Sequence, residues 1–288
     1  MTEFIKVISP GLYSSIQDIG RFGFRKYGVP VSGVMDEQSA SLANHLLNNS
    51  PESALMEITM VGPKFLFETP TLIAISGADI SPQLNRIPVQ LNKVISVSKG
   101  DILSFGKLHY GLRCYLAVKG GFQTESVMGS KSSLVPITNK STIQKNDQLP
   151  ITGYDQQENH LSSVRVDQSF FTMSNLPCSK GPEFDLLTAS EQGSIFNEKL
   201  LVSQDNNRMG YRLEGYSFEY PACYNMLTSS VLPGTIQLTP SGNLIALMKD
   251  CQTTGGYPRI LQLSQGGINK LAQKKATEII SFSLENEG

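Results

Sequence analysis

The chain has 288 residues, which is enough for one large domain or two domains of ordinary size with a substantial core. Apolar residues make up 40% and charged residues 17%, a globular rather than a disordered composition. A net charge of −1 gives no electrostatic reason to expect nucleic acid or an anionic membrane as a partner. The sequence has neither a secretion-signal pattern nor an apolar run of about 20 residues, so we expect a cytoplasmic protein without membrane spans.

Cysteine and histidine spacing argues against several kinds of site. The four cysteines (Cys114, Cys178, Cys223 and Cys251) contain no close pair, which disfavours a zinc site or a disulfide framework. The three histidines (His45, His109 and His160) lie in unrelated contexts, and His109 is expected in a loop. No glycine-rich phosphate loop ending in Lys-Ser/Thr occurs, so the chain is not expected to bind ATP by that device.

The N-terminal region predicts a strand over Phe4–Ile8 followed by a long shaped loop over residues 14–30. Three glycines and several charges in that loop argue against a regular element. Two interpretations of Asp18 and Arg21 stay open. Either the two side chains pair to hold the loop, or they form a fork that recognises a carboxylate or an amide.

A helix is predicted over residues 37–49, because apolar residues recur on one face and acidic residues lie at its N-terminal end. Strands then follow at short spacing, with turn residues between them; we predict them over residues 55–60, 65–67, 71–77, 94–97, 102–105 and 114–118. Residues 98–101 are predicted to be a hairpin turn that joins two of these strands. This spacing is typical of a mainly β fold, either a barrel or a sandwich.

Two acidic residues stand out among these strands. Glu57 interrupts an apolar run, and a buried carboxylate needs a partner, for which Arg21 or Arg25 is the expected choice. Asp79 follows the apolar run 71–77 and is a further polar residue at a strand end.

Residues 129–160 are polar and lack strong periodicity, which indicates loops that connect two lobes, residues 1–160 and residues 161–288. In the second lobe we predict a strand over residues 162–167, a short helix around residues 188–192 and a hairpin of residues 235–239 and 244–248. A strand over 260–263, a short helix over 268–273 and a final strand over 279–284 complete the lobe.

Residues 249–258 (Lys-Asp-Cys-Gln-Thr-Thr-Gly-Gly-Tyr-Pro) follow an apolar strand and supply neutral hydrogen-bonding groups and a pliable backbone. A tight polar turn would have the same composition, and that interpretation stays open. The functional interpretation gains from two similar clusters, residues 17–21 and residues 205–212, each of which contains glycine and arginine. We predict that the three clusters contribute to one site.

These three clusters, together with residues 28–36 and 234–242, resemble the family of the 5-oxoprolinase C subunit. The resemblance lies both in the order of the motifs along the chain and in their amino-acid sequences. The family is also described as KipI antagonist (KipA) and allophanate hydrolase subunit 2, and it is related to the carboxyltransferase part of urea carboxylase. The resemblance runs from about residue 5 to residue 285. It implies cyclophilin-like β-barrel lobes with a few short helices, and partners that are homologues of the A and B subunits, the latter KipI-like. With these partners the chain would cleave 5-oxo-L-proline, a small molecule, to L-glutamate at the expense of ATP.

The family pattern carries over to a defined set of motif positions: Gln17, Asp18, Arg21, Asp36, Glu57, Arg208, Arg212, Asp250, Gln252, Thr253, Thr254 and Tyr257. From these we take Asp18, Arg208, Arg212 and Asp250 as candidate catalytic residues. Candidate substrate-binding residues are Gln17, Arg21, Gln252, Thr253, Thr254, Gly255, Gly256 and Tyr257. No metal ligands are expected. The chain departs from the family pattern at residues 135–147, where an arginine and several glycines are replaced.

Two other functions fit the same residues. The chain would serve as half of a biotin-dependent carboxyltransferase that acts on urea or a similar small amide, in which case biotin is the cofactor. Alternatively, it would bind a KipI-like kinase inhibitor without chemistry of its own, which agrees with the lack of a recognisable catalytic triad, metal site or phosphate loop.

Overall fold

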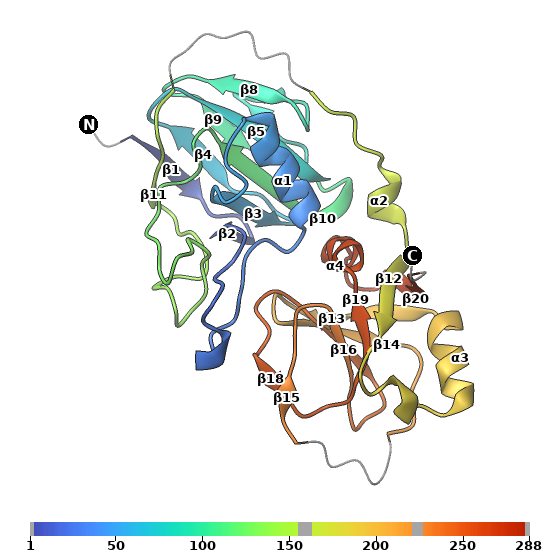
Figure 1. The fold of residues 1–288 in the computed structure, drawn as a ribbon. Coiled ribbons are helices and arrows are strands. Elements are labelled where there is room, and N and C mark those ends of the chain that lie inside the picture. The colour runs from blue at the N-terminus through green and yellow to red at the C-terminus, as the bar shows by residue number, and fades with distance from the viewer. Residues whose placement is uncertain (1–2, 155–162, 221–226, 286–288) are drawn as a thin grey trace. The chain divides into compact units, whose positions relative to one another are not determined.

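A computed structural model describes residues 3–154, 163–220 and 227–285. Internal contacts divide the chain into two compact units (Figure 1). The first unit comprises residues 1–22 and 32–172, and the second comprises residues 23–31 and 173–288. Each unit is therefore assembled from separate stretches of chain, because the loop 23–31 leaves the first unit and joins the second. His160 and Cys223, named above, lie outside the described residues, as does the end of the predicted connection between lobes, residues 155–160.

The first unit contains two β-sheets. The six-stranded sheet has the order β11 (Gln148–Pro150), β1 (Phe4–Ser9), β4 (Lys64–Phe67), β9 (Ile102–Ser104), β6 (Gln83–Leu84), β7 (Ile87–Pro88). The five-stranded sheet has the order β2 (Tyr13–Gln17), β3 (Leu55–Thr59), β10 (Tyr110–Val118), β5 (Thr71–Asp79), β8 (Val94–Val97). All the strand pairs in both sheets are antiparallel.

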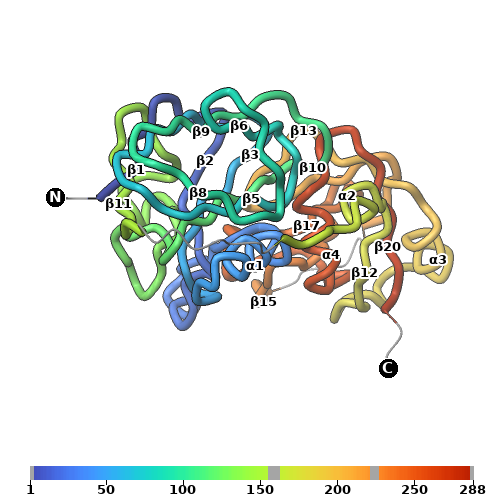
Figure 2. Tube along the Cα trace, turned by 90° about the horizontal axis from the view of Figure 1, so that it is seen from above, coloured from blue at the N-terminus to red at the C-terminus, as the bar shows by residue number. Residues whose placement is uncertain are grey.

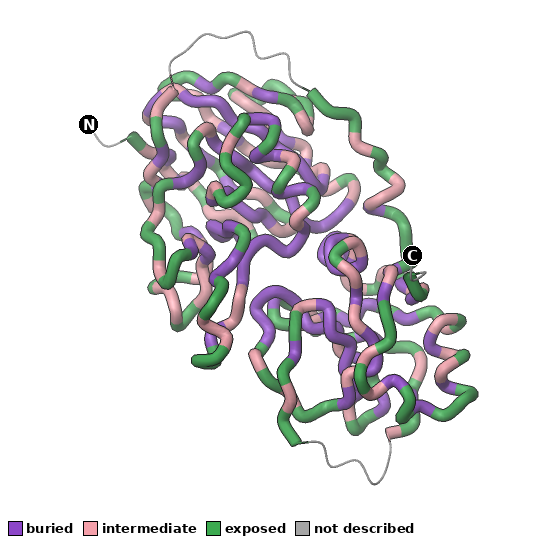
Figure 3. Tube along the Cα trace, in the orientation of Figure 1, coloured by how far each residue is buried: buried purple, intermediate pink, exposed green. Residues whose placement is uncertain are grey.

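The main core of this unit is built from the apolar faces of both sheets. Phe65 and Leu103 come from the six-stranded sheet, and Ile75 and Leu116 from the five-stranded one, and all four are fully buried. A second apolar cluster lies on the other face of the five-stranded sheet, where α1 (Glu37–Leu46) packs against β5 and β10 (Figures 1 and 2). The five-stranded sheet is therefore covered on both faces, which explains the almost continuously buried runs in β5 and β10 (Figure 3).

Helix α1 confirms the predicted helix and shows why it begins at residue 37. The side chain of Asp36 caps it by accepting hydrogen bonds from the backbone nitrogen and the hydroxyl of Ser39, at 3.1 and 2.6 Å. The helix ends at Leu46, three residues before the predicted end, and Asn48 has a positive φ of 50° that no helix continues through.

The structure corrects three local predictions in this unit. Residues 14–17 are not loop: they belong to β2, because they pair along their whole length with β3. Residues 98–101 do form a turn, but not a hairpin, since β8 pairs with β5 in one sheet and β9 pairs with β4 in the other. Residues 163–167 form one isolated bridge rather than the predicted strand, and α2 (Ser169–Thr172) follows them.

The second unit is a closed seven-stranded barrel. Its order is β12 (Asn175–Lys180), β19 (Arg259–Leu263), β16 (Thr235–Leu238), β17 (Leu244–Leu247), β14 (Gly210–Glu214), β13 (Leu200–Asn206), β20 (Ile279–Leu284). The contact of β12 with β20 is parallel, and the other pairs are antiparallel. A separate two-stranded sheet joins β15 (Ser229–Ser230) to β18 (Thr254–Gly255). The predicted hairpin of β16 and β17 and the predicted final strand are confirmed.

Helices α3 (Ala189–Asn197) and α4 (Gln265–Ala272) lie where short helices were predicted, although both begin or end a few residues away. The side chains of Thr188 and Glu191 cap the first turn of α3 reciprocally. Short 3-10 helices occur at Arg25–Tyr27 and Phe184–Leu186. No helix in the described ranges is long and apolar enough to cross a membrane. The mainly β fold with a few short helices is confirmed.

Candidate functional site

The carboxylate of Asp18 lies in a cradle of hydrogen-bond donors at the end of β2. Its Oδ1 accepts hydrogen bonds from the hydroxyls of Ser130 and Ser132, at 2.7 and 2.6 Å, and from the backbone nitrogen of Gly20 at 2.9 Å. Its Oδ2 accepts from the backbone nitrogen of Lys131 at 2.6 Å. Four donors to its two oxygens hold this carboxylate in one orientation.

Arg21 and Gln17 fasten the same loop. Arg21 is fully buried, and it donates from Nε to the carbonyl of Val127 at 2.9 Å and from Nη2 to the carbonyl of Ser132 at 2.8 Å. Gln17 donates to the carbonyl of Ser133 at 3.3 Å. The three predicted residues of the first cluster therefore converge on one loop, residues 127–133. In this geometry Nε and Nη2 of Arg21 each donate to a backbone carbonyl.

Gly33 explains how the chain passes so close to Asp18. Its φ is +91°, and an added Cβ would lie 3.0 Å from the carbonyl oxygen of Asp18 and from the backbone nitrogen of Gly20. A side chain at this position would therefore be strained by its backbone conformation and would crowd the cradle. Residues 18–20 and 33–34 run side by side, as the hydrogen bond from Val34 N to Asp18 O at 3.0 Å shows.

A cavity of about 510 Å³ opens beside this loop. Ile16, Lys131 and Ser133 line it on one side, and residues 137–142 line it on the other. The second wall belongs to the segment that departs from the family pattern, and Lys140 in it forms an ion pair with Asp147 at 2.7 Å. The changed residues therefore lie where a ligand beside the Asp18 cradle would touch them.

The expected partner of Glu57 was wrong. Its Oε2 accepts hydrogen bonds from Tyr115 Oη at 2.9 Å and from Met35 N at 2.7 Å, and Arg113 Nε lies 3.7 Å from its Oε1. Arg113 stands in the neighbouring strand β10, which the sequence could not pair with β3. Burial, together with the nearby negative charges of Glu57 and Asp36, raises the pKa of Tyr115, so its hydroxyl stays protonated and donates to Glu57.

In the second unit, Arg208 and Asp250 form a buried ion pair. Arg208 donates from Nε to Asp250 Oδ2 at 2.8 Å and from Nη2 to Oδ1 at 3.1 Å, and both side chains are only 6% exposed. The backbone joins the same two residues, because Asp250 N donates to Arg208 O at 2.9 Å. Two of the predicted clusters, residues 205–212 and 249–258, are thereby brought together at one rim of the barrel.

Arg25, which sequence analysis considered only as a partner for Glu57, belongs to this second unit. Its guanidinium donates to the carbonyls of Val231 and Thr253, the latter at 3.2 Å. Gln252, Thr254 and Gly256 are exposed. Neither Gly255 nor Gly256 has the positive φ that glycine allows, so the flexibility expected of this pair is not used for a left-handed turn.

Arg212 does not join Arg208. It lies on the exposed face of β14 and lines a cleft of about 390 Å³ together with Tyr257. The carboxylates of Asp205 and Glu214 line the same cleft and would compete with an anionic ligand for the Arg212 guanidinium. The predicted residues thus fall into three groups: the Asp18 cradle, the Arg208–Asp250 pair with Thr253, and the Arg212–Tyr257 cleft.

Ser130 and Ser132 are the residues that sequence analysis missed. They lie more than 100 positions from Asp18 in a polar stretch interpreted only as a connecting loop. Two serines at alternate positions after Gly129 could have indicated a polar site, but nothing in the sequence pattern predicted that they contact Asp18. Within the described ranges, no group of three or more His, Cys, Asp or Glu side chains could hold a metal ion.

The two units and the motif clusters define the class of protein. Residues 27–284 match the family model described as carboxyltransferase domain, subdomain A and B, and the chain belongs to this family. It is 31% identical to the 5-oxoprolinase C subunit of Escherichia coli K12, in an alignment that covers 96% of this chain and 90% of that protein. It is also 35% identical to the urea amidolyase of Lachancea kluyveri, over 73% of this chain and 12% of that protein.

Solved structures show the same fold. The crystal structure of TTHA0988 superposes with a TM-score of 0.89 at 23% identity, and the match covers 98% of this chain and 55% of that one. The Kluyveromyces lactis urea carboxylase gives a TM-score of 0.85 at 29% identity, with 98% of this chain and 27% of that one covered. This chain therefore spans about half of the first structure and about a quarter of the second.

Proposed function

We propose that this chain is the C subunit of an ATP-dependent 5-oxoprolinase, which cleaves 5-oxo-L-proline to L-glutamate together with the A and B subunits. The observation that carries the proposal is the near full-length similarity to the Escherichia coli protein, with 31% identity along 96% of the chain. The Haemophilus influenzae protein of the same name supports it, with 28% identity over 93% of the chain. Because the sequence similarity extends over both units, it favours a shared function for the whole chain over a similarity of fold alone.

Opening a lactam near neutral pH requires polarisation of the carbonyl group and an activated nucleophile. We propose that the Asp18 carboxylate orients a water molecule beside the cavity lined by Lys131 and Ser133. The four donors around Asp18 limit its movement, which suits an orienting role. In this proposal Arg21 and Gln17 position the loop that carries Ser130 and Ser132.

The arginines of the second unit receive different roles. Arg208 already satisfies Asp250 with two parallel hydrogen bonds, so we propose that this pair positions the segment that carries Gln252, Thr253 and Thr254. Arg212 is exposed and remains the candidate fork for a substrate carboxylate, with Tyr257 beside it. The ATP is used by the complex, within the cytoplasm, and not through a phosphate loop of this chain.

An omission experiment tests the proposal. The chain is mixed with homologues of the A and B subunits, and ATP hydrolysis dependent on 5-oxo-L-proline is measured with each component left out in turn. We expect substrate-dependent hydrolysis to disappear when this chain is omitted. Hydrolysis that continues at an unchanged rate without it would overturn the proposal.

A biotin-dependent carboxyltransferase is the second candidate, and the similarity to urea amidolyase favours it. Under this alternative the same polar side chains would hold urea or a similar amide while a biotinylated carrier protein delivers the carboxyl group. Carboxyl transfer from a carboxylated carrier to urea, measured by loss of labelled carboxyl from the carrier, distinguishes the two. Transfer that requires this chain would support the alternative.

A further inference from the structure

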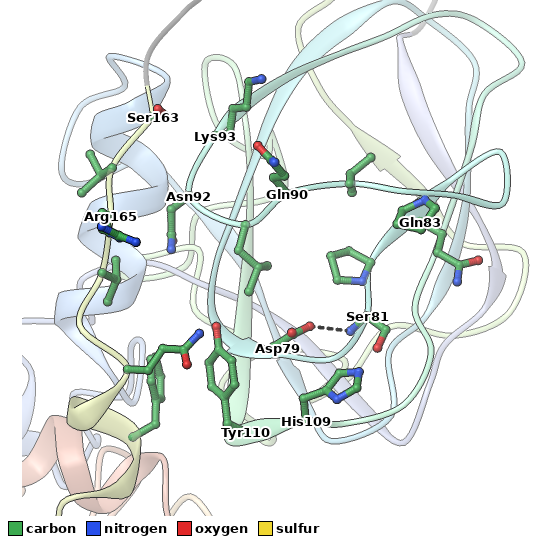
Figure 4. A pocket seen from close by; sticks show the side chains of 18 residues that line it. Asp79, Ser81, Gln83, Gln90, Asn92, Lys93, His109, Tyr110, Ser163 and Arg165 are labelled. Atoms are coloured by element: carbon green, nitrogen blue, oxygen red, sulfur yellow. Dashed lines mark hydrogen bonds between the residues drawn. The ribbon is translucent and has the colours of Figure 1, made fainter.

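A second cavity of the first unit lies away from the Asp18 cradle and takes part in none of the roles above. It has a volume of about 970 Å³ and is bounded by the end of β5, the turns around β6 and β7, the start of β10 and residues 163–171 (Figure 4). Its size falls in the range of pockets that hold small organic ligands. None of the motif positions carried over from the family lines it.

Residues 163–171, which we name the strap, form one wall. The backbones of Ser163 and Lys93 form an isolated antiparallel β-bridge, and Val164 N donates to the carbonyl of Asn92 at 3.0 Å. Farther along, Phe171 packs against Tyr110 with ring centroids 4.9 Å apart. The wall is thus fixed at both of its ends by contacts within the unit, which preorganises the cavity for a ligand.

One side of the cavity is negative. Asp79 lies at the end of β5, and its Oδ1 accepts a hydrogen bond from Ser81 N at 2.8 Å. Its Oδ2 makes no hydrogen bond among the described residues, so one carboxylate oxygen is available to a donor in the cavity. An ammonium or amide N–H group is the natural partner for it.

The other side is positive. In Figure 4 the guanidinium of Arg165, carried by the strap, and the hydroxyl of Tyr110 point into the same part of the cavity. Neither Arg165 nor Lys93, which also lines the cavity, forms a side-chain ion pair within the part of the chain that the structure describes. A guanidinium and a phenol that line the same cavity both supply hydrogen-bond donors for a carboxylate.

Tyr110 remains a neutral donor in this setting. Burial and the neighbouring charge of Asp79 both raise the pKa of its hydroxyl. The phenol of Tyr110 lines the cavity and carries a proton that it can donate to an acceptor there. Asn92 adds a polar group to the same wall, since its Oδ1 is buried without a hydrogen-bond partner among the described residues.

We propose that this cavity binds a free amino acid with an acidic side chain. The α-carboxylate would bind Arg165 and Tyr110, and the α-ammonium would bind Asp79. Two cations, Lys93 and Arg165, face one carboxylate among these residues, and this surplus of positive charge favours a ligand that carries a second carboxylate. The inference does not depend on the proposed function, because binding is measured on this chain alone.

Ligand-observed NMR and isothermal calorimetry on the isolated chain test the proposal, with L-glutamate, L-lysine, L-leucine, acetate and inorganic phosphate as probes. We expect L-glutamate to bind most tightly, and acetate at least about tenfold more weakly, because it lacks the ammonium group that Asp79 would bind. Arg165→Gln and Asp79→Asn should each weaken L-glutamate binding by about tenfold or more. Asparagine keeps an acceptor for Ser81 N, so this variant removes the charge while preserving the turn.

Arg86→Gln is the matched control, since Arg86 is an exposed arginine of the same unit that does not line the cavity. It should leave binding unchanged, and circular dichroism should show all three variants folded. The proposal is overturned if L-glutamate does not bind, if acetate or phosphate binds as tightly, or if neither cavity variant weakens binding relative to Arg86→Gln.

Discussion

Replacing Arg208 with alanine would leave the carboxylate of Asp250 in a buried site without its bidentate partner. The two hydrogen bonds of 2.8 and 3.1 Å and the 6% exposure of both side chains place this pair among buried ion pairs. Removing one member of such a pair costs about 3–5 kcal/mol, since the remaining buried charge loses its bidentate partner. For a unit of between 100 and 150 residues, this corresponds to a fall in melting temperature of roughly 10–20 °C.

Thermal and urea denaturation followed by circular dichroism measure this loss. Arg212→Ala is the control, because Arg212 is exposed on the nearby strand β14 and should change stability by no more than about 0.5 kcal/mol. The double variant Arg208→Met with Asp250→Leu removes both charges and should recover much of the stability. If Arg208→Ala is less than about 1 kcal/mol less stable than the parent, the structural role assigned to this pair is wrong.

Three further predictions concern other buried groups. Glu57→Gln should lower stability by about 1–3 kcal/mol in urea unfolding, because it removes the charge that Tyr115, Met35 N and Arg113 surround; an unchanged midpoint would contradict the assigned contacts. Burial raises the pKa of Cys251 to about 11 and that of Cys178 to about 12, so these thiols are protonated at pH 8 and should react with iodoacetamide far more slowly than in urea. Reaction should quicken as pH rises towards these values, and peptide mass spectrometry that finds both modified rapidly at pH 8 would refute this. Gly33→Ala should lower the free energy of unfolding by more than about 1 kcal/mol. Gly23→Ala, at a similar φ but with nothing within 4 Å of the added Cβ, should lower it by less. Equal decreases in the two variants would show that crowding against Asp18 is not the cause.

The sequence predicted most of the regular elements because their signals are local. The hairpin of β16 and β17 has a turn between two apolar runs, and β20 was predicted with its observed bounds. Helix α1 was recognised from the acidic residues at its N-terminal end and from its apolar stripe. Strand β2 was missed because its pairing partner β3 lies about 40 residues away, and its own residues are mixed polar and apolar.

The candidate site residues show the same difference between local signals, which the sequence carries, and contacts between distant residues, which it does not. The three clusters were identified from residue type, and the structure brings Arg208 to Asp250 and gathers Gln17, Asp18 and Arg21 around one loop. Ser130, Ser132 and the partners of Glu57 could not be predicted, since each depends on strand pairing or a loop path that no local pattern encodes. The cavity near Asp79 was signalled only by a polar residue at a strand end.

Formation of L-glutamate from isotopically labelled 5-oxo-L-proline by the complete complex is the most direct test of the central claim. The complex is assembled from homologues of the A and B subunits with the parent chain, with Asp18→Ala, or with the control Arg86→Gln. We expect the parent and Arg86→Gln complexes to form labelled glutamate in the presence of ATP. We expect the complex with Asp18→Ala, assembled to the same extent, to have a kcat at least about 100-fold lower, because a side chain that orients a reacting group is removed. Equal rates from the Asp18→Ala and parent complexes, or no glutamate from any of them, would contradict the central claim.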